Sequence, residues 1–391
     1  MKILFWMFIG FDQHATSEHL LSAVIERLCE AGHSVHIIQK DTGGDLPAIP
    51  EKLSNYDVTT DVIPYQAANK GNFIARYLTE LKYIKACEKH ITSDYDAVFI
   101  QSNNVAGFAV RAVRKKLPKA IVTFNVQDIF PYNLVYSGGL KKSSPVFKIL
   151  AAEQRYGYKC SDHIITISED MKDTLVADGM EAEKIEVIYN WSYQDGLYEN
   201  VDLTPVSHMF RPDRFNVVYA GNIGVMQNVD ILLEAAKLMK DDKGVSFHII
   251  GDGVYKKKLE ARAKEYELAN VSFWPMQPPE LAPAVYSAAG VNVIPLVKDV
   301  YRTALPSKTA TCLACRKPIV FAIGKDSRFG KRALEEAGCA VVESDDAEAL
   351  AAAIKNCAGE HDAGKAAAFY LKHMEKTANS RKYADLITKR P

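Results

Sequence analysis

The chain has 391 residues, of which 48% are hydrophobic and 25% are charged, and its 48 Lys and Arg residues balance its 48 Asp and Glu residues. This balance excludes a general electrostatic attraction to nucleic acid or anionic lipid, so any basic surface must be local. The length exceeds that of one ordinary core and predicts two domains.

The first half of the chain alternates apolar runs with amphipathic segments. The opening MKILFWMFIGF lacks a small-residue cleavage pattern and predicts a buried strand over Ile3–Ile9 rather than a signal peptide. Ser17 is a candidate N-cap for the next helix, and Gly32 is expected to end it. Further strands are expected at Val35–Ile38, Ala97–Ile100, Ile121–Phe124, His163–Ile167 and Ile185–Tyr189, and helices at Phe73–His90 and Pro145–Lys159.

The second half restarts the same rhythm after Trp191–Asp213, a segment rich in Pro, Asn and Asp that is the expected linker. Strands are expected at Phe215–Ala220, Phe247–Ile250, Val271–Trp274, Val291–Ile294, Ile319–Ala322 and Ala340–Glu343. Helices are expected at Val229–Lys240 and Val254–Tyr266, before Ala289, and after the PSK sequence at 306–308.

This alternation predicts an α/β protein with two Rossmann-like domains, each built on a parallel sheet covered by helices on both faces. We expect the first domain at residues 1–195 and the second at 196–370, with 371–391 forming a C-terminal helix that returns to the first domain. The two sheets are expected to face a central cleft, with ligands beyond the carboxyl ends of the strands.

The seven cysteines are scattered and odd in number, which indicates a reducing compartment and argues against a disulfide framework. Cys312 and Cys315 form a CxxC, but no second Cys/His pair stands near them, so two small buried thiols are favoured over a metal site. No apolar run approaches the roughly 18 residues of a membrane span. We therefore expect a cytoplasmic protein.

Loops after strands of the second half carry candidate binding residues. Gly221-Asn222-Ile223-Gly224 and Gly251-Asp252-Gly253 each follow a strand and precede a helix. Glycine there would let the backbone approach a ligand while helix N–H groups face an anion. A plain tight turn is the alternative for each loop. Trp274 ends another strand, where its indole could support a flat base or simply pack in the core.

A lysine stands at an expected helix start. Pro306 and Ser307 fit the beginning of a helix, and Lys308 places an ammonium in its first turn. Cations are disfavoured there because a helix N-terminus already carries partial positive charge. An anionic partner such as a phosphate would explain this placement, and solvent exposure of the side chain is the alternative.

Polar residues also follow strands of the first half. Gly10 and His14 lie after the first strand, and His14 is a candidate donor to a diphosphate or acceptor, with an ordinary surface histidine as the alternative. Gln127 and Asp128 follow another strand, and Asp128 is a lone carboxylate in its short loop. The sequence ISED at 167–170 follows a third strand and can be read as a helix cap. His33 and His36 flank a strand start and are interpreted as structural.

Five stretches of the second half occur in the order found in a known family: YAGNIGVMQNVDILLEAA, HIIGDGVYKKKLEARAKE, NVSFWPMQ, VYSAAGVNVIPL and PSKTATCLACRKPIV. They resemble the retaining glycosyltransferases of family 4 (group 1), which have the GT-B fold. In the first half, FNVQDIFP, HIITISEDM and KIEVIYNW extend the resemblance over nearly the whole chain. Within this family, the sequence most resembles bacterial transferases that assemble surface polysaccharides such as O-antigen, capsule or colanic acid.

The resemblance implies that the second domain binds a nucleotide diphosphate sugar, with UDP favoured, and that the first binds a saccharide or lipid-linked saccharide acceptor. Together with the loops described above, the expected donor contacts are Gly221, Asn222, Gly224, Gly251, Asp252, Gly253, Trp274, Ser307, Lys308 and Thr311, of which the resemblance itself implies Gly221, Gly224 and Lys308. On the acceptor side we expect Gly10, His14, Gln127 and Asp128, of which the resemblance implies Asp128. Asp128 and Lys308 are the expected catalytic residues. No cofactor or metal ion is expected, because no DxD-like triplet stands in a convincing loop.

The chain departs from the family pattern in its charged residues. Many relatives carry an Arg after the first glycine of the second domain and a Lys a few residues later, where this chain has Asn222 and Gln227-Asn228. Many also carry two glutamates eight positions apart, where it has Thr303 and Thr311. A hydroxyl can still bind a ribose, but it loses the charge-assisted part of the bond.

The sequence therefore predicts transfer of a hexose, N-acetylhexosamine or deoxy-aminosugar, with retention, in surface-polysaccharide biosynthesis. A sugar-nucleotide 2-epimerase and a non-catalytic nucleotide-sugar-binding subunit remain alternatives. No nucleic acid partner is expected. In the first domain, basic residues interleave with aromatic ones over 76–85 and 141–159, which predicts peripheral contact with the inner face of the cell membrane. Ordinary solvated helix faces are the alternative.

Overall fold

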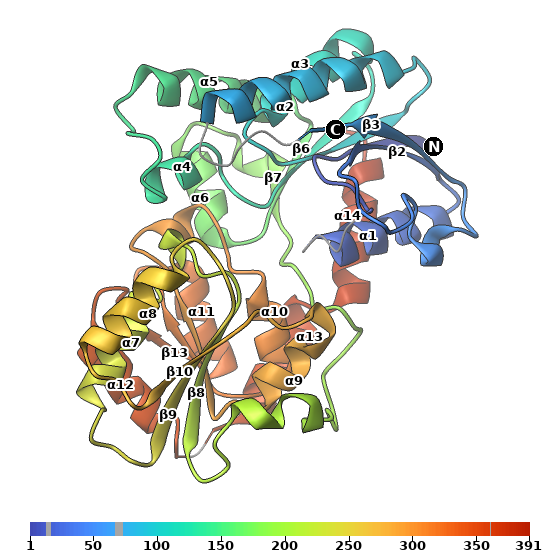
Figure 1. Cartoon of the computed structure of the whole chain (residues 1–391). Coiled ribbons are helices and arrows are strands. Elements are labelled where there is room, and N and C mark those ends of the chain that lie inside the picture. The colour runs from blue at the N-terminus through green and yellow to red at the C-terminus, as the bar shows by residue number, and fades with distance from the viewer. Residues whose placement is uncertain (13–16, 67–72, 360) are drawn as a thin grey trace. The chain divides into compact units, whose positions relative to one another are not determined.

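The computed structural model describes residues 1–12, 17–66, 73–359 and 361–391, which form two compact units. The first unit comprises Met1–Tyr189 and Lys376–Pro391, and the second comprises Asn190–Glu375. The predicted fold class is confirmed, because each unit holds one parallel sheet with helices on both faces (Figure 1). The last helix of the chain belongs to the first unit.

The first unit holds a seven-stranded sheet in the order β3-β2-β1-β4-β5-β6-β7. Its strands are β1 (Lys2–Trp6), β2 (Ser34–Asp41), β3 (Val58–Pro64), β4 (Ala97–Gln101), β5 (Ile121–Val126), β6 (His163–Thr166) and β7 (Ile185–Val187). Its helices are α1 (Glu18–Glu30), α2 (Phe73–Cys87), α3 (Ala106–Lys116), α4 (Tyr132–Tyr136), α5 (Pro145–Cys160), α6 (Glu169–Ala177) and α14 (Lys376–Thr388), with short 3-10 turns η1 (Glu51–Leu53), η2 (Glu88–His90) and η3 (Ala182–Lys184).

Strand β1 lies inside this sheet, between β2 and β4. Helices α1 and α14 pack together below the sheet in Figure 1, and α3 packs with α5 above it. Because β1 has strands on both sides and helices on both faces, every side chain from Ile3 to Trp6 is fully buried. This burial explains the continuous apolar run that opens the sequence.

The second unit holds a six-stranded sheet in the order β10-β9-β8-β11-β12-β13. Its strands are β8 (Phe215–Ala220), β9 (Val245–Ile250), β10 (Val271–Trp274), β11 (Val291–Pro295), β12 (Ile319–Ala322) and β13 (Ala340–Val342). Its helices are α7 (Asp230–Leu238), α8 (Lys256–Glu265), α9 (Ala282–Ser287), α10 (Lys308–Ala314), α11 (Arg328–Ala337), α12 (Ala347–Asn356) and α13 (Ala363–His373), with short turns η4 (Thr204–Met209), η5 (Val225–Gln227), η6 (Pro279–Leu281) and η7 (Val300–Arg302).

The structure departs from the sequence-based expectations at three places. Ser17 precedes α1 but makes no capping hydrogen bond, and its Oγ instead lies 3.4 Å from Nε2 of Gln101. Strand β3 was not predicted, because only Ile63 of its seven residues is buried and its sequence lacks a clear apolar rhythm. The expected linker is not free, because its first residues, Trp191 and Ser192, are buried in the second unit.

None of the helices in the described part of the chain is both long and apolar enough to span a membrane.

Candidate functional site

Two glycine loops meet at the carboxyl edge of the second sheet. Gly221 follows β8 with φ 137°, and its N–H donates to the carbonyl oxygen of Ile250 at 2.9 Å. Gly251 follows β9 with φ 156°, and a Cβ there would lie 1.9 Å from the carbonyl oxygen of Gly221. A Cβ at Gly253 would lie 2.3 Å from the carbonyl oxygen of Ile223. Glycine is required at 251 and 253 because the backbones of the two loops touch.

Lys308 begins α10 and extends its side chain over the first of these loops. Its Nζ lies 3.8 Å from the ring centroid of Tyr219, and a Cβ on Gly221 would lie 2.8 Å from the same nitrogen. Nζ has no carboxylate or hydrogen-bond partner within the described ranges, and burial lowers the pKa of Lys308 to about 8. A half-buried cation without a counter-charge is suited to bind an anion.

Uncharged side chains hold the rest of the loop after β8. Oε1 of Gln227 accepts from the N–H of Gly224 at 3.1 Å and from Nδ2 of Asn222 at 3.3 Å. Asn228 has φ 47°, and its Nδ2 donates to the carbonyl oxygen of Ser344 at 2.6 Å. These amides stabilise the loop, and they add no positive charge for a ligand.

The loop after β9 is held by Lys256 and by its own backbone. The carboxylate of Asp252 is exposed and accepts from the N–H of Gly253 at 2.8 Å, and the Asp252 carbonyl accepts from the N–H of Ile223 at 2.7 Å. Nζ of Lys256 donates to the carbonyl oxygens of Gly251 and Trp274, at 2.9 and 3.1 Å. This lysine therefore ties the ends of β9 and β10 together.

Trp274, the predicted support for a base, packs beside two histidines. Its indole N–H donates to Nδ1 of His248 at 3.4 Å, and its ring meets the ring of His208 edge-on at 5.8 Å. His248 is buried, and desolvation lowers its pKa to about 4, so it is a neutral hydrogen-bond partner. The contact of Trp274 with a base stays a prediction, and its packing contacts are those of a structural residue.

The two threonines at the glutamate positions of relatives are buried. Thr303 donates to the carbonyl oxygen of Val300 at 3.1 Å. Oγ1 of Thr311 lies 3.1 Å from Oγ of Ser192, which in turn lies 2.8 Å from the hydroxyl of Tyr198. A glutamate at position 311 would place a carboxylate against this buried chain of hydroxyls. Ser307, the residue before α10, is exposed and makes no capping bond.

Asp128 lies just past the end of β5, at the carboxyl edge of the first sheet. Its carboxyl group is half-buried and has no hydrogen-bond or ion-pair partner among the residues that the structure describes. Burial raises the pKa of Asp128 to about 7. A carboxyl group with a pKa near neutrality can accept a proton from an acceptor hydroxyl at physiological pH.

Gln127, also predicted on the acceptor side, is fixed by its neighbours. Its backbone N–H donates to Oγ of Ser102 at 3.1 Å. Its Nε2 donates to Oδ1 of Asn125 at 3.1 Å and to the hydroxyl of Tyr383 at 3.3 Å. Tyr383 comes from α14, far along the chain.

The loop after β1 contains Gly10, predicted on the acceptor side, and is tightly packed. A Cβ on Gly10 would lie 2.4 Å from the carbonyl oxygen of Lys40. Asp12 accepts from the N–H and Oγ1 of Thr42 at 2.8 and 2.6 Å, and hydrogen bonds lower its pKa against the opposing effect of burial. These contacts are structural. His14, the predicted donor in this loop, lies outside the described residues.

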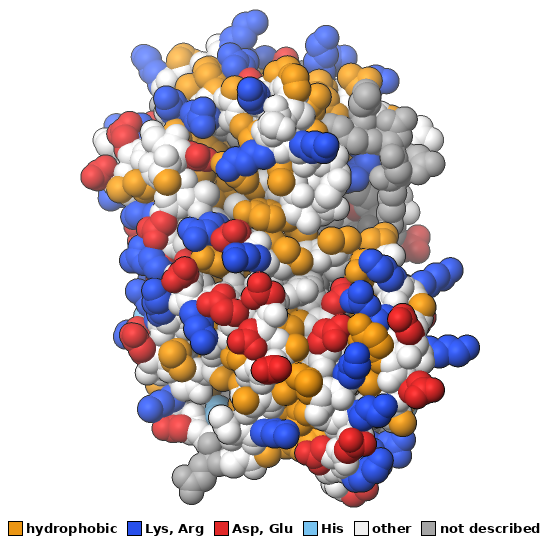
Figure 2. Space-filling view, turned by 90° about the vertical axis from the view of Figure 1, so that its left-hand side faces the viewer, with side chains coloured by type: hydrophobic (Ala, Val, Ile, Leu, Met, Phe, Trp, Pro, Cys, Tyr) orange, Lys and Arg blue, Asp and Glu red, His pale blue; other side chains and the backbone are white. Residues whose placement is uncertain are grey.

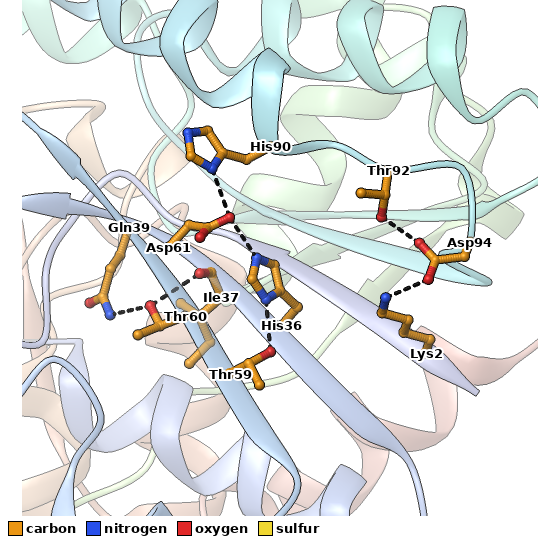
Figure 3. Close-up of polar contacts among 10 residues, drawn as sticks. All are labelled: Lys2, His36, Ile37, Gln39, Thr59, Thr60, Asp61, His90, Thr92 and Asp94. Atoms are coloured by element: carbon orange, nitrogen blue, oxygen red, sulfur yellow. Dashed lines mark hydrogen bonds and ion pairs between the residues drawn. The ribbon is translucent and has the colours of Figure 1, made fainter.

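The histidines beside β2 have structural partners, as predicted. His33 Nδ1 lies 3.1 Å from the N-terminal amine. The ring of His36 on β2 contacts two side chains of β3: its Nδ1 is 2.8 Å from Oγ1 of Thr59 and its Nε2 is 3.1 Å from Oδ2 of Asp61. Figure 3 shows that His90 meets the same Asp61 oxygen, at 2.8 Å. In the ISED sequence, Ser168 caps α6 by accepting from the N–H of Met171, which confirms the predicted cap.

The buried thiols of the CxxC are confirmed, since Cys312 and Cys315 are both buried and free. Among the residues that the structure describes, no three His, Cys, Asp or Glu side chains are arranged to hold a metal ion. Metal-free function stays a prediction.

Sequence reasoning missed several residues that shape these edges. The ring of Tyr219 lies beneath the Lys308 ammonium. Tyr219 stands two residues before Gly221, and this closeness in the sequence could have indicated its contact with the site. Ser192 and Tyr198 lie in the stretch interpreted as a linker, so their contact with Thr311 was hidden. Nothing in the sequence points from Tyr383 to Gln127.

Comparison with known families assigns both units to the same class of protein. Residues 17–191 match the model for Glycosyltransferase Family 4, and residues 214–360 match the model for Glycosyl transferases group 1. With two parallel-sheet units, these matches place the chain among the glycosyltransferases of the GT-B fold.

The proteins that are similar to the chain include two curated proteins and a solved structure. WcaI of Escherichia coli (strain K12), named as a candidate colanic acid biosynthesis glycosyl transferase, is 29% identical over 61% of this chain and 60% of its own length. WbjE of Pseudomonas aeruginosa, named as a probable glycosyltransferase, is 22% identical over 85% of this chain and 82% of its own. The crystal structure of Anabaena HepE with UDP and glucose has a TM-score of 0.70 at 15% identity and covers 98% of both chains.

Proposed function

We propose that this protein transfers a sugar from a nucleoside diphosphate sugar to an acceptor hydroxyl, with retention of the anomeric configuration, as a member of glycosyltransferase family 4. The observation that carries the proposal is Lys308, a half-buried ammonium without a counter-charge beside Gly221 at the carboxyl edge of a Rossmann-like sheet. Ligands of such sheets bind at this edge. The glycosyltransferase matches over both units supply the class of reaction.

The chemistry requires stabilisation of a leaving diphosphate. Negative charge grows on its bridging oxygen as the bond to the sugar breaks, and a positioned cation lowers the energy of that state. Lys308 would supply this charge, and bound diphosphate would in turn favour the protonated form of the amine. We propose that the reaction needs no metal ion, because the ammonium and backbone N–H groups can supply the positive charge. Asp128 would orient or deprotonate the acceptor hydroxyl.

The substrate class follows from the relatives and is part of the proposal. WcaI is named for colanic acid biosynthesis, and the HepE structure contains UDP. We therefore propose a UDP-linked donor sugar and a saccharide or lipid-linked saccharide acceptor in surface-polysaccharide biosynthesis. The proposed sugar is a hexose, N-acetylhexosamine or deoxy-aminosugar.

Calorimetric titration of the purified protein with UDP and with GDP tests the donor site. We expect UDP to bind more tightly than GDP, and we expect the same affinity with EDTA as with Mg²⁺. A panel of UDP-sugars then tests turnover: release of UDP with transfer supports the proposal, whereas conversion of the sugar without UDP release indicates an epimerase. Binding without any turnover would identify a non-catalytic subunit, and no binding of either nucleotide would contradict the proposed site.

We also propose that α5 contacts an anionic membrane when the acceptor is lipid-linked. Its outward residues include Val146 and Ile149, which are 44% and 63% exposed, and the exposed basic residues Lys148, Arg155 and Lys159. No carboxylate is among the exposed residues of this helix. Blue basic and orange apolar side chains intermingle over the upper part of Figure 2, the side on which α4 and α5 lie in Figure 1.

We expect the protein to float with anionic vesicles at low salt and to be released at high salt, because each basic residue near an anionic surface contributes about 1 kcal/mol. Ile149→Asp should weaken this binding, since it adds a negative charge and removes an apolar contact. Leu334→Asp is the matched control, because Leu334 is 52% exposed on α11 of the second unit. Equal recovery of wild type and Ile149→Asp with the vesicles, or no flotation at low salt, would contradict the contact.

A further inference from the structure

The loop that carries Asp128 is fastened to the last helix of the chain. Tyr383 on α14 is 3% exposed, and its hydroxyl lies 3.2 Å from Oδ1 of Asn125 on β5. Gln127 contacts both of these side chains, because its Nε2 donates to the Tyr383 hydroxyl at 3.3 Å and to Oδ1 of Asn125 at 3.1 Å. Helix α14 packs on β5 and β4, so the hydroxyl reaches the edge of the sheet from a rigid element.

The backbone of Gln127 is fixed as well. Its N–H donates to Oγ of Ser102 at 3.1 Å, and the N–H of Ser102 donates to the carbonyl oxygen of Asn125 at 2.9 Å. Gln127 is thus held through its main chain by Ser102, the residue after β4, and through its side chain by Tyr383 on α14. The backbone of the next residue, Asp128, forms a single β-bridge, and its carboxyl group has no partner of its own within the described ranges. The contacts at residue 127, directly before it, therefore help to set where this carboxyl group lies.

We propose that Tyr383 is a positioning residue for Asp128: through Gln127, the hydroxyl on α14 fixes the carboxyl group that receives the acceptor hydroxyl. The inference rests on the proposed transferase function for its kinetic consequence, and its structural part is independent of that function. Tyr383 is proposed to touch neither the substrate nor the reacting atoms. Its effect passes through one side chain to the neighbouring residue.

Tyr383→Phe removes the hydroxyl and leaves an amide hydrogen of Gln127 without its acceptor. The loop should then lose its fixed position, and a misplacement of about 1 Å at a reacting group can reduce rate about 100-fold. We expect kcat to fall by about 10- to 100-fold, with KM for the donor and the affinity for UDP unchanged. Tyr83→Phe is the matched control, because Tyr83 is 2% exposed in the same unit and donates to the carbonyl oxygen of Met7 at 2.6 Å.

A double-mutant cycle separates positioning from a general loss of stability. Tyr383→Phe should reduce kcat in the wild-type background but have almost no further effect in Asp128→Asn, because the group to be positioned is gone. Equal fold-losses in both backgrounds would overturn the proposal, as would wild-type kcat in Tyr383→Phe. If thermal unfolding shows that Tyr383→Phe does not fold, Gln127→Met removes the same hydrogen bonds, and the same cycle decides with that variant.

A second readout needs no substrate. In protein labelled with ¹³C at the aspartate carboxyl carbon, the signal missing in Asp128→Asn identifies Asp128, and its titration can be followed by NMR. Burial alone raises the pKa of Asp128 to about 7, with no charged neighbour contributing, so a loosened loop that admits water should lower this pKa. We expect that shift in Tyr383→Phe and not in Tyr83→Phe. An unchanged titration in Tyr383→Phe would overturn the proposal even if the wild type has no transferase activity.

Discussion

Replacement of Asp128 by asparagine is expected to reduce turnover by about 100- to 10,000-fold, the range measured for positioned acid–base groups. The amide has nearly the size of the carboxyl group but cannot accept a proton from the acceptor hydroxyl. Since Asp128 belongs to the first unit and Lys308 to the second, the affinity for the nucleotide should not change. Steady-state kinetics and calorimetric titration of UDP measure the two effects separately.

The pH dependence gives an independent check on Asp128. A base must be deprotonated to act, and burial raises the pKa of Asp128 to about 7, so kcat/KM of the wild type should rise as the pH increases through 7. Asp128→Asn should lose this rise together with most of its activity. Asp178→Asn is a suitable control, because Asp178 follows α6 and accepts from the hydroxyl of Tyr132 at 3.3 Å. Loss of nucleotide binding in a folded Asp128→Asn variant would show that the assignment is wrong.

Replacement of Lys308 by alanine is expected to weaken the binding of UDP by about 10- to 100-fold, because a charged hydrogen bond contributes about 1.5–3 kcal/mol. Turnover should fall as well, since the same ammonium would stabilise the departing diphosphate. Lys264→Ala, an exposed residue of α8, changes the net charge equally and should bind UDP as the wild type does. Lys308→Ala that binds UDP with wild-type affinity would remove the donor site and most of the proposed function.

The affinity for UDP should also depend on pH. Burial lowers the pKa of Lys308 to about 8, so the free protein holds the amine charged at pH 7 and mostly neutral at pH 9. Binding should therefore weaken by about tenfold between these values, because protonation must accompany binding. Lys308→Arg stays charged throughout and should lose this dependence. A pH-independent affinity in the wild type would show that the ammonium does not touch the diphosphate.

The fold could be predicted from the sequence because strands and helices are indicated by patterns of apolar and polar residues that lie close together in the chain. Short, mostly apolar runs bounded by turn residues, such as Phe215–Ala220, favour buried strands, and the structure gives β8 the same bounds. Edge strands give weaker signals, and β3 was missed because only one of its seven residues is buried. Helix ends shifted by one to three residues because fraying and capping depend on neighbours outside the helix.

The residues of the candidate site were named from the sequence, but the contacts between them could not be. The glycines at 221, 251 and 253 were singled out from the sequence, but no spacing reveals that Gly251 packs against the carbonyl of Gly221 and Gly253 against that of Ile223. The contact of the Thr311 hydroxyl with Ser192, 119 residues earlier in the chain, could not be read from the sequence, and its contact with a ribose stays a prediction. The raised pKa of Asp128 and the lowered pKa of Lys308 arise from burial, which is known only once the fold is known.

The return of α14 to the first unit has a consequence for biosynthesis. All of Asn190–Glu375 is translated before α14, which at about 5–20 residues per second takes roughly ten to forty seconds. During this time the second unit, which is continuous, can fold as it leaves the ribosome. The first unit cannot be completed until α14 has been made. Until then, the surface that packs against Ile387 and Tyr383 of α14 stays exposed to water. We therefore expect chaperones to bind mainly Met1–Tyr189 of the nascent chain, and the second unit to finish folding before the first.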